Sequence, residues 1–417
     1  MAASYSSWGL VRQATVGHGS WPRAWRAAAA KPSYRVVIVG GGGHGIATAY
    51  YLAKEHGITD VAVLEKGWIG GGNTGRNTTV VRSNYLRPES AAFYDFSLRL
   101  YERLTAELNF NIMFSRRGLT TLLHSPHAVN AAWGQLNTLH LNGIDAEILS
   151  REELQRRVPL LNFAPDARFP IHGAIVQPRA GVVRHDAVVW GYARGADARG
   201  VDIVQNCEVT GIEARDGRVN GVHTRQGFIA ASQVVMAVAG SSSLVAATAG
   251  IRLPIMTYPL QAMVTEPIKP CLDTVVLSPA TGSYVSQSDR GELVIGGGLD
   301  RYPSYAQRGS IAVTASTVAG LLEIFPSFSR LKLMRQWAGM VDIIADSSPI
   351  LGFAPVRGMF INAGWGTGGF KAIPAGGWTT AWSIAHQREH PMIAPFSLGR
   401  FARGALIDEA AAAVIAH

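Results

Sequence analysis

A cluster of glycines at residues 40–45 is the first group that could do chemistry. Gly40, Gly42 and Gly45 match the spacing G-x-G-x-x-G. This spacing lets the backbone approach a pyrophosphate, whose charge is stabilised by the N-terminus of the following helix. Glu65 follows 20 residues after Gly45, where a carboxylate can accept hydrogen bonds from ribose hydroxyls. These residues predict a dinucleotide site but do not separate FAD from NAD.

Two further loops favour FAD. Residues 70–78 are small, with amide and hydroxyl donors that could lie along a long cofactor. Residues 362–371 contain glycines that would let backbone N–H groups point at a ring, and they end in Lys371. A lysine there would stabilise a reduced, anionic flavin.

The elements that must hold these residues follow from apolar patterning. Residues 35–39 and 61–64 read as strands and 45–55 as a helix, which together predict a parallel β-α-β unit. Residues 90–108 carry one apolar helical stripe. Residues 185–194 and 314–324 read as further helices, an Asp216-Gly217 turn predicts a hairpin, and residues 255–300 are β-rich.

We therefore expect an α/β fold in which a Rossmann-like FAD-binding domain is interleaved with a β-rich, α+β substrate domain. The predicted FAD-binding domain comprises residues 34–112, 180–250 and 340–417. The predicted substrate and catalytic domain comprises residues 113–179 and 251–339, and residues 1–33 form an N-terminal arm.

Composition limits the classes of function. Of 417 residues, 47% are hydrophobic and 16% are charged, as in a globular protein. The net charge of +9 suits anionic ligands, but the basic residues are scattered, so we expect no nucleic-acid binding. The most apolar run, residues 36–52, suits a buried strand turning into a helix rather than a membrane span. Cys207 and Cys271 form no CxxC pair, so we expect a cytoplasmic protein, and we expect no metal site.

The first 33 residues allow two interpretations. They are rich in arginine, serine and alanine and precede the first acidic residue, Glu55, which is typical of a transit peptide. They also contain Trp8, Trp21 and Trp25. Because exposed tryptophans are costly, we favour an arm that packs on a partner subunit.

Four segments resemble a known family: Val36–Gly45, Gly72–Thr79, Arg184–Val188 and Gly364–Lys371. They resemble the D-amino-acid-oxidase group of glutathione-reductase-like flavoproteins, and within it the β subunits of heterotetrameric sarcosine oxidases. The resemblance runs from about Tyr34 to the C-terminus and includes the tryptophan-rich arm.

The resemblance implies an enzyme that demethylates sarcosine at a noncovalent FAD. Electrons would pass to an FMN at the boundary with an α subunit and then to oxygen, which gives hydrogen peroxide. The α subunit would bind NAD and tetrahydrofolate, which captures the formaldehyde unit, and γ and δ subunits would complete the heterotetramer.

The family pattern also implies roles for single residues. His185 would carry the FMN covalently, with Arg184 and Arg179 as nearby cations. Without the resemblance, His185 would be interpreted as an ordinary residue at the start of a helix, next to Asp186. Arg82 and Lys371 would hold the substrate carboxylate. The strand at residues 292–295 lacks the lysine that simpler sarcosine oxidases use for oxygen.

The residues expected to hold FAD come from all these segments. His44 most simply uses its backbone, with a catalytic imidazole as the alternative. The expected set is Gly40, Gly42, Gly43, His44, Gly45, Glu65, Asn73, Thr74, Arg76, Thr78, Val80, Val209, Gly366, Gly368, Gly369 and Lys371.

Two other functions remain open at this point. One is a single-FAD dehydrogenase or oxidase acting on dimethylglycine, glycine or a D-amino acid, which would turn over without covalent flavin. The other is a noncatalytic scaffold that carries electrons between subunits.

Overall fold

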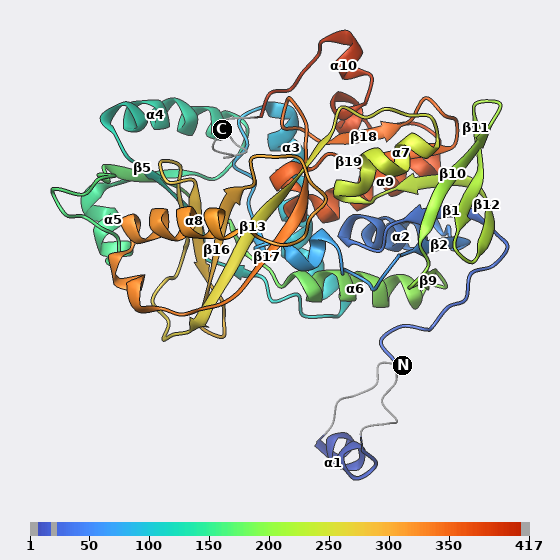
Figure 1. Ribbon diagram of the computed structural model, residues 1–417, viewed down its shortest axis with the longest axis horizontal. Coiled ribbons are helices and arrows are strands. Elements are labelled where there is room, and N and C mark those ends of the chain that lie inside the picture. The colour runs from blue at the N-terminus through green and yellow to red at the C-terminus, as the bar shows by residue number, and fades with distance from the viewer. Residues whose placement is uncertain (1–6, 18–22, 410–417) are drawn as a thin grey trace.

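Two eight-stranded sheets lie side by side along the longest axis of the molecule (Figure 1). The computed structural model describes residues 7–17 and 23–409. The first sheet contains β1 (Ser33–Val39) and the second contains β13 (Met256–Pro267). Segments of the two sheets alternate along the chain, as the predicted α/β fold with an interleaved β-rich part requires.

The first sheet contains the predicted β-α-β unit. β1 pairs in parallel with β2 (Val61–Leu64) and with β12 (Gly227–Met236), and α2 (Gly43–His56) connects β1 to β2. The helix begins two residues earlier than expected, inside the glycine turn. The remaining strands of this sheet are β9 (Asp202–Val204), β10 (Val209–Arg215), β11 (Arg218–Thr224), β18 (Ile350–Phe353) and β19 (Met359–Ala363). β10 and β11 form the predicted antiparallel hairpin.

Both faces of this sheet are covered. Successive side chains of β1 point to opposite faces, and each set is buried in a different hydrophobic cluster. Val36 and Ile38 belong to one hydrophobic cluster, and Val37 and Val39 to another. Complete burial of each such side chain is worth roughly 1.5–3 kcal/mol. The first cluster includes side chains of α2, α3 (Pro88–Leu108), α6 (His185–Asp197) and α9 (Ile373–His386), and α7 (Ser242–Thr248) contributes to the second.

The second sheet is mainly antiparallel, which confirms the β-rich prediction. Its other strands are β5 (Leu119–Leu123), β6 (Glu147–Ser150), β7 (Gly173–Gln177), β14 (Val275–Ser278), β15 (Ser283–Gln287), β16 (Glu292–Leu299) and β17 (Leu333–Ile343). α4 (Pro126–Leu141), α5 (Arg151–Arg157) and α8 (Ile311–Ile324) accompany it. β17 crosses the boundary expected at 339/340, and the proposed domain division itself remains a prediction.

A third, three-stranded sheet joins segments that carry candidate site residues. β8 (Gly181–Val182) pairs with both β3 (Val80–Val81) and β4 (Ser115–Arg116). Arg82 directly follows β3, and His185 follows β8 by three residues.

The two described parts of the N-terminal arm differ in their contacts with the rest of the protein. α1 (Ser7–Thr15) has no buried residue. Trp25 packs against the first hydrophobic cluster, while Arg26 and Lys31 form ion pairs with Asp197 (2.9 Å) and Asp202 (3.0 Å). The rest of the predicted arm, residues 1–6 and 18–22 with Trp21, lies outside the described residues. Within residues 7–17 and 23–409, none of the helices has both the length and the apolarity needed to cross a bilayer.

Candidate functional site

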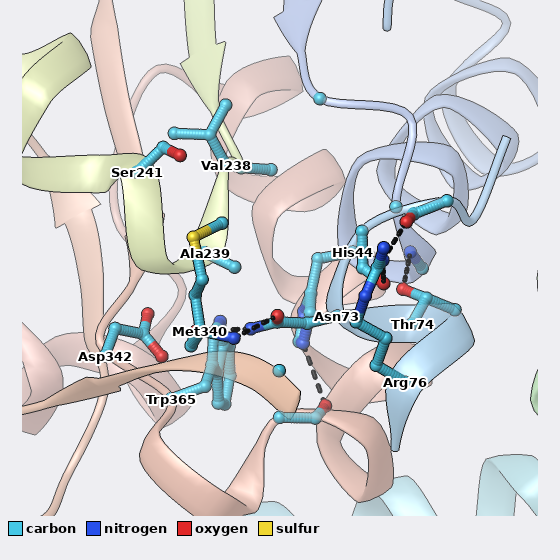
Figure 2. A pocket seen from close by; sticks show the side chains of 18 of the residues that line it. His44, Asn73, Thr74, Arg76, Val238, Ala239, Ser241, Met340, Asp342 and Trp365 are labelled. Atoms are coloured by element: carbon cyan, nitrogen blue, oxygen red, sulfur yellow. Dashed lines mark hydrogen bonds between the residues drawn. The ribbon is translucent and has the colours of Figure 1, made fainter. Parts of the chain in front are cut away.

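A cavity of about 760 Å³, cavity 1, lies where β1 and β2 end and extends to β17. Figure 2 shows a pocket whose lining residues come from several of these segments. Most of the expected FAD residues line cavity 1: Gly40, Gly42, Gly43, His44, Glu65, Asn73, Thr74, Arg76, Thr78, Val209, Gly366 and Gly369. The structure therefore brings together three sequence segments that were expected to hold one cofactor.

The glycine turn is fixed by close backbone approach. Gly40 has φ +109°, and a Cβ there would lie 2.3 Å from the carbonyl oxygen of Ala237. A Cβ at Gly45 would lie 2.0 Å from the carbonyl oxygen of Gly40. Gly45 does not line cavity 1 and instead lets α2 begin directly against the turn.

Glu65 lies in the wall of cavity 1 with its carboxylate held at both oxygens. Oε2 accepts a hydrogen bond from Gly41 N and Oε1 accepts one from Gly67 N, each at 2.8 Å. A carboxylate has about four lone-pair sites, so it can also accept from a ligand hydroxyl. This arrangement suits the predicted contact with a ribose.

The 70–78 loop binds the protein as well as lining the cavity. Asn73 in η1 (Asn73–Arg76) donates to Met340 O at 2.6 Å and accepts from Met340 N at 2.9 Å. Thr74 Oγ1 accepts from Gly43 N at 2.9 Å. These bonds join the glycine turn of the first sheet to β17 of the second (Figure 2).

His44 uses its side chain to tie α2 to the 364–371 loop. Its Nε2 lies 2.9 Å from Gly369 O, so Nε2 carries the hydrogen, and its ring stacks on Trp365 with centroids 4.3 Å apart. Nδ1 has no hydrogen-bond partner among the described residues. Burial lowers the pKa of His44 to about 4, so the imidazole is neutral at physiological pH.

Hydroxyl groups of α3 hold the far side of the same loop. Ser97 donates to Lys371 O at 2.7 Å, and Tyr101 donates to Phe370 O at 2.6 Å. A Cβ at Gly368 would lie 2.2 Å from the hydroxyl oxygen of Tyr94. Gly368 therefore contributes close packing rather than the wall of cavity 1.

A second cavity of about 1,420 Å³, cavity 2, adjoins cavity 1 and shares wall residues such as Thr78, Tyr284 and Phe370. Arg82 and Lys371 line it, and each is only 7% exposed. Lys371 and Val80 were expected beside FAD; both line cavity 2 and not cavity 1.

The two cations in cavity 2 differ in their surroundings. Lys371 Nζ donates to Thr367 O at 2.8 Å. Burial, together with the charge of Arg82, holds the pKa of Lys371 well below its usual range. Arg82 donates to Asn84 Oδ1 at 2.6 Å and lies over the ring of Tyr85, 4.7 Å from its centroid.

His185 lies apart from both cavities, at the start of α6. Its Nδ1 is buried and has no hydrogen-bond partner within the part of the chain that the structure describes. Burial lowers the pKa of His185. The expected nearby cations are both paired, Arg184 with Asp186 (2.8 Å) and Arg179 with Glu102 (3.1 Å). Their charges are therefore largely compensated.

Sequence reasoning missed the contributions of β15 and β17 to the cavities. Tyr284 lines both cavities, and its hydroxyl lies 2.7 Å from that of Thr78. Asp342 lines cavity 1 and is 2% exposed. Neither has a local motif, since each reaches the site only through packing of the two sheets. In the described ranges, no group of three or more His, Cys, Asp or Glu side chains could hold a metal ion.

Comparison with known proteins identifies the family. Residues 35–382 match the family model described as FAD dependent oxidoreductase. The chain is 49% identical to the sarcosine oxidase subunit beta of Rhodobacter capsulatus over 99% of both chains. It is 50% identical to that of an Arthrobacter species over 94% of this chain and 97% of the relative.

A solved L-proline dehydrogenase from P. horikoshii has a TM-score of 0.84 at 27% identity. The match covers 90% of this chain and all of that one. A glycine oxidase from Geobacillus kaustophilus, with a TM-score of 0.80 at 23% identity over 89% of this chain and 99% of that one, shares the fold. The chain therefore belongs to the FAD-dependent oxidoreductase family and, within it, to the sarcosine oxidase β subunits, which makes it a flavin-dependent oxidoreductase.

Proposed function

We propose that this enzyme oxidises the N-methyl group of sarcosine, with FAD held in cavity 1 and sarcosine in cavity 2. The observation that carries this proposal is the pair of buried cations, Arg82 and Lys371, in a cavity that adjoins cavity 1. The names of the relatives, sarcosine oxidase subunit beta, support the choice of substrate. When bound, FAD supplies the acceptor for the hydride of the substrate.

Arg82 and Lys371 would bind and orient the substrate carboxylate. A guanidinium can hold a carboxylate through two parallel hydrogen bonds, and the ammonium adds a point charge. A carboxylate beside Lys371 would favour its protonated form, which burial disfavours.

The residues of cavity 1 would hold FAD through different contacts. Gly40, Gly42 and Gly43 and the start of α2 suit the pyrophosphate, and Glu65 suits the ribose. The complete set that we propose is the one expected from the sequence, with Gly45 and Gly368 acting through packing and with Val80 and Lys371 on the side of cavity 2.

Arg82→Met and Lys371→Met test the substrate site. Each removes a charge-assisted interaction worth about 1.5–3 kcal/mol, so the sarcosine concentration for half-maximal flavin reduction should rise roughly 10- to 100-fold. The measurement is anaerobic bleaching of bound FAD by sarcosine in stopped flow. Arg99→Met, in which an exposed arginine of α3 is replaced, is the control.

Unchanged flavin reduction in both variants would contradict the proposal and favour a noncatalytic electron-carrying scaffold. FAD content, measured from the visible absorbance of the purified variants, separates loss of substrate binding from loss of the cofactor.

We also propose that His185 is the residue that would tether FMN covalently, through one of its ring nitrogens and the 8-methyl group of the flavin. The buried, neutral imidazole supports this role because Nδ1 has no partner among the described residues. A third cavity, of about 650 Å³, is lined by Asn111 and Arg116. Ile112, next to Asn111, accepts a hydrogen bond at its carbonyl oxygen from Arg184 N at 3.1 Å, so the segment that lines this cavity adjoins the residue before His185.

The remaining parts of the proposal concern the assembly. We propose that electrons from sarcosine reach FMN and then oxygen, giving hydrogen peroxide. An α subunit would bind NAD and pass the formaldehyde unit to tetrahydrofolate, γ and δ subunits would complete a heterotetramer, and the complex would be cytoplasmic. The subunit names of the relatives support a multisubunit enzyme.

Acid denaturation of the purified complex tests the covalent flavin. Yellow colour should stay with the wild-type chain and be lost in His185→Asn. A colourless wild-type chain that still turns over sarcosine alone would instead favour a single-FAD dehydrogenase or oxidase.

A further inference from the structure

Asp342 of β17 belongs to the second sheet, yet its carboxylate binds the cofactor loop of the first. Its Oδ2 accepts a hydrogen bond from Gly364 N at 2.6 Å. Burial raises the pKa of Asp342 to about 6, while the backbone groups of Gly364, Trp365 and Gly366 act to lower it. Asp342 is 2% exposed and lies in the wall of cavity 1, near Met340 and Trp365 (Figure 2).

The backbone of the loop is shaped to receive an anion. The φ angles alternate between +71° at Gly364, −74° at Trp365 and +52° at Gly366. Alternation between left- and right-handed conformations turns successive N–H groups toward one side and forms a nest, which is a known anion-binding concavity. Here the described structure already provides the anion, the carboxylate of Asp342.

This arrangement changes the expectation for the loop. Backbone N–H groups of residues 362–371 were expected to point at a flavin ring, but that of Gly364 binds Asp342. The N–H group of Gly368 donates to Trp365 O at 2.8 Å. The glycine at 364 is needed for a second reason, because a Cβ there would lie 2.1 Å from Ile344 Cδ1.

We propose that Asp342 is a positioning residue for the FAD site, whose carboxylate occupies the nest of residues 364–366 and sets the backbone of the loop that ends in Lys371. Asp342 acts through this loop, which also lines cavity 1 through Gly366 and Gly369. The proposal depends on FAD binding, which follows from the family, and not on sarcosine as the substrate.

Chemical rescue in Asp342→Ala tests the proposal with the full-length chain. Loss of hydrogen bonds to a charged acceptor should raise the FAD dissociation constant about tenfold or more. Formate at tens of millimolar should then restore most of the affinity and the visible circular dichroism of bound FAD, because a small carboxylate can enter the vacated nest. An equal concentration of sodium chloride controls for ionic strength.

Asp202→Ala is the matched control, since Asp202 is also a buried carboxylate but pairs with Arg26 and Lys31 outside the cavities. It should leave the FAD dissociation constant within about twofold of the wild type and insensitive to formate. The proposal is overturned if Asp342→Ala binds FAD like the wild type, or if formate has no more effect on it than chloride.

Amide hydrogen exchange in the FAD-loaded wild-type protein tests the proposal even if Asp342→Ala fails to fold. The amides of residues 364–366 should exchange slowly, as bonds to a buried carboxylate require. Rapid, unprotected exchange there would overturn the nest. If these outcomes support Asp342 while sarcosine fails to reduce the flavin, only the proposed substrate is wrong.

Discussion

At the scale of single residues, burial sets the charge of the side chains that hold the site together. His44 remains neutral because burial lowers its pKa to about 4, and this allows it to donate to Gly369 O from Nε2 while Nδ1 carries no proton. Protonation would place a charge on a nitrogen with no partner among the described residues. His44 is thus a structural tie that acid should weaken.

His44→Gln should make the protein less sensitive to acid. In the wild type, the unfolded state binds a proton at His44 below pH 6.5 while the folded state does so only near pH 4. Stability is therefore lost as pH falls from 6.5 to 4, by on the order of 2–3 kcal/mol. A glutamine can keep the donor near the Nε2 position without titrating. Urea unfolding at several pH values between 7 and 4 measures this difference.

His127→Gln serves as the control, because His127 is exposed on α4. Its free energy of unfolding should follow that of the wild type across the same pH range. If His44→Gln lost stability on acidification as steeply as the control, the tie would not depend on the neutral imidazole.

At the scale of elements, α3 acts as a support for the 364–371 loop. One side of the helix presents hydroxyls to the loop, with Ser97 bound to Lys371 O and Tyr101 bound to Phe370 O. A 21-residue helix packed in the first hydrophobic cluster is rigid. The position of Lys371 therefore depends on α3 as well as on its own loop.

Tyr101→Phe tests this support. The change removes one of two donors to the carbonyl oxygen of Phe370, which keeps its hydrogen bond from Ile373 N, and should cost about 0.5–1.5 kcal/mol. Both the free energy of unfolding and the affinity for FAD should fall. Tyr192→Phe is a matched control, since Tyr192 is also buried but its hydroxyl lies 3.1 Å from that of Tyr51, away from the loop. It should lose stability without losing FAD affinity, and equal effects on FAD would contradict a specific role for α3.

At the scale of the whole molecule, the end of the described chain is tied to the connection between the two sheets. Arg400 is fully buried and binds both carboxylate oxygens of Asp346, at 2.8 and 2.9 Å. It also donates to Ser348 O and Pro349 O, between β17 and β18. Glu409 N in turn donates to Asp346 O at 3.1 Å.

Arg400→Met should destabilise the whole protein because it leaves the charge of Asp346 buried without its partner, at a cost of about 3–5 kcal/mol. Arg290→Met, which breaks the ion pair of an exposed arginine with Glu292, should lower the free energy of unfolding much less. Denaturant unfolding of both variants measures the difference. Similar losses in the two variants would show that the buried pair contributes no more than a surface one.

Local sequence patterns determined the cofactor class, the β-α-β unit and most helices and strands. The glycine spacing and Glu65 were informative because pyrophosphate and ribose contacts need particular residues at short, constant separations. The stripe at residues 90–108 predicted a buried helix because apolar spacing reflects which face is covered. The roles of Arg82 and His185 came only from family resemblance and remain proposals.

Tertiary structure alone decided which side chains share a cavity and which N–H groups remain available to a ligand. Asn73 and Met340 are 267 positions apart, and Asp342 reaches Gly364 from a different sheet. Lys371 lines cavity 2 rather than cavity 1 because of how its loop packs between α3 and β17. Such contacts have no period or spacing along the chain, since they arise only when two separately patterned sheets pack together.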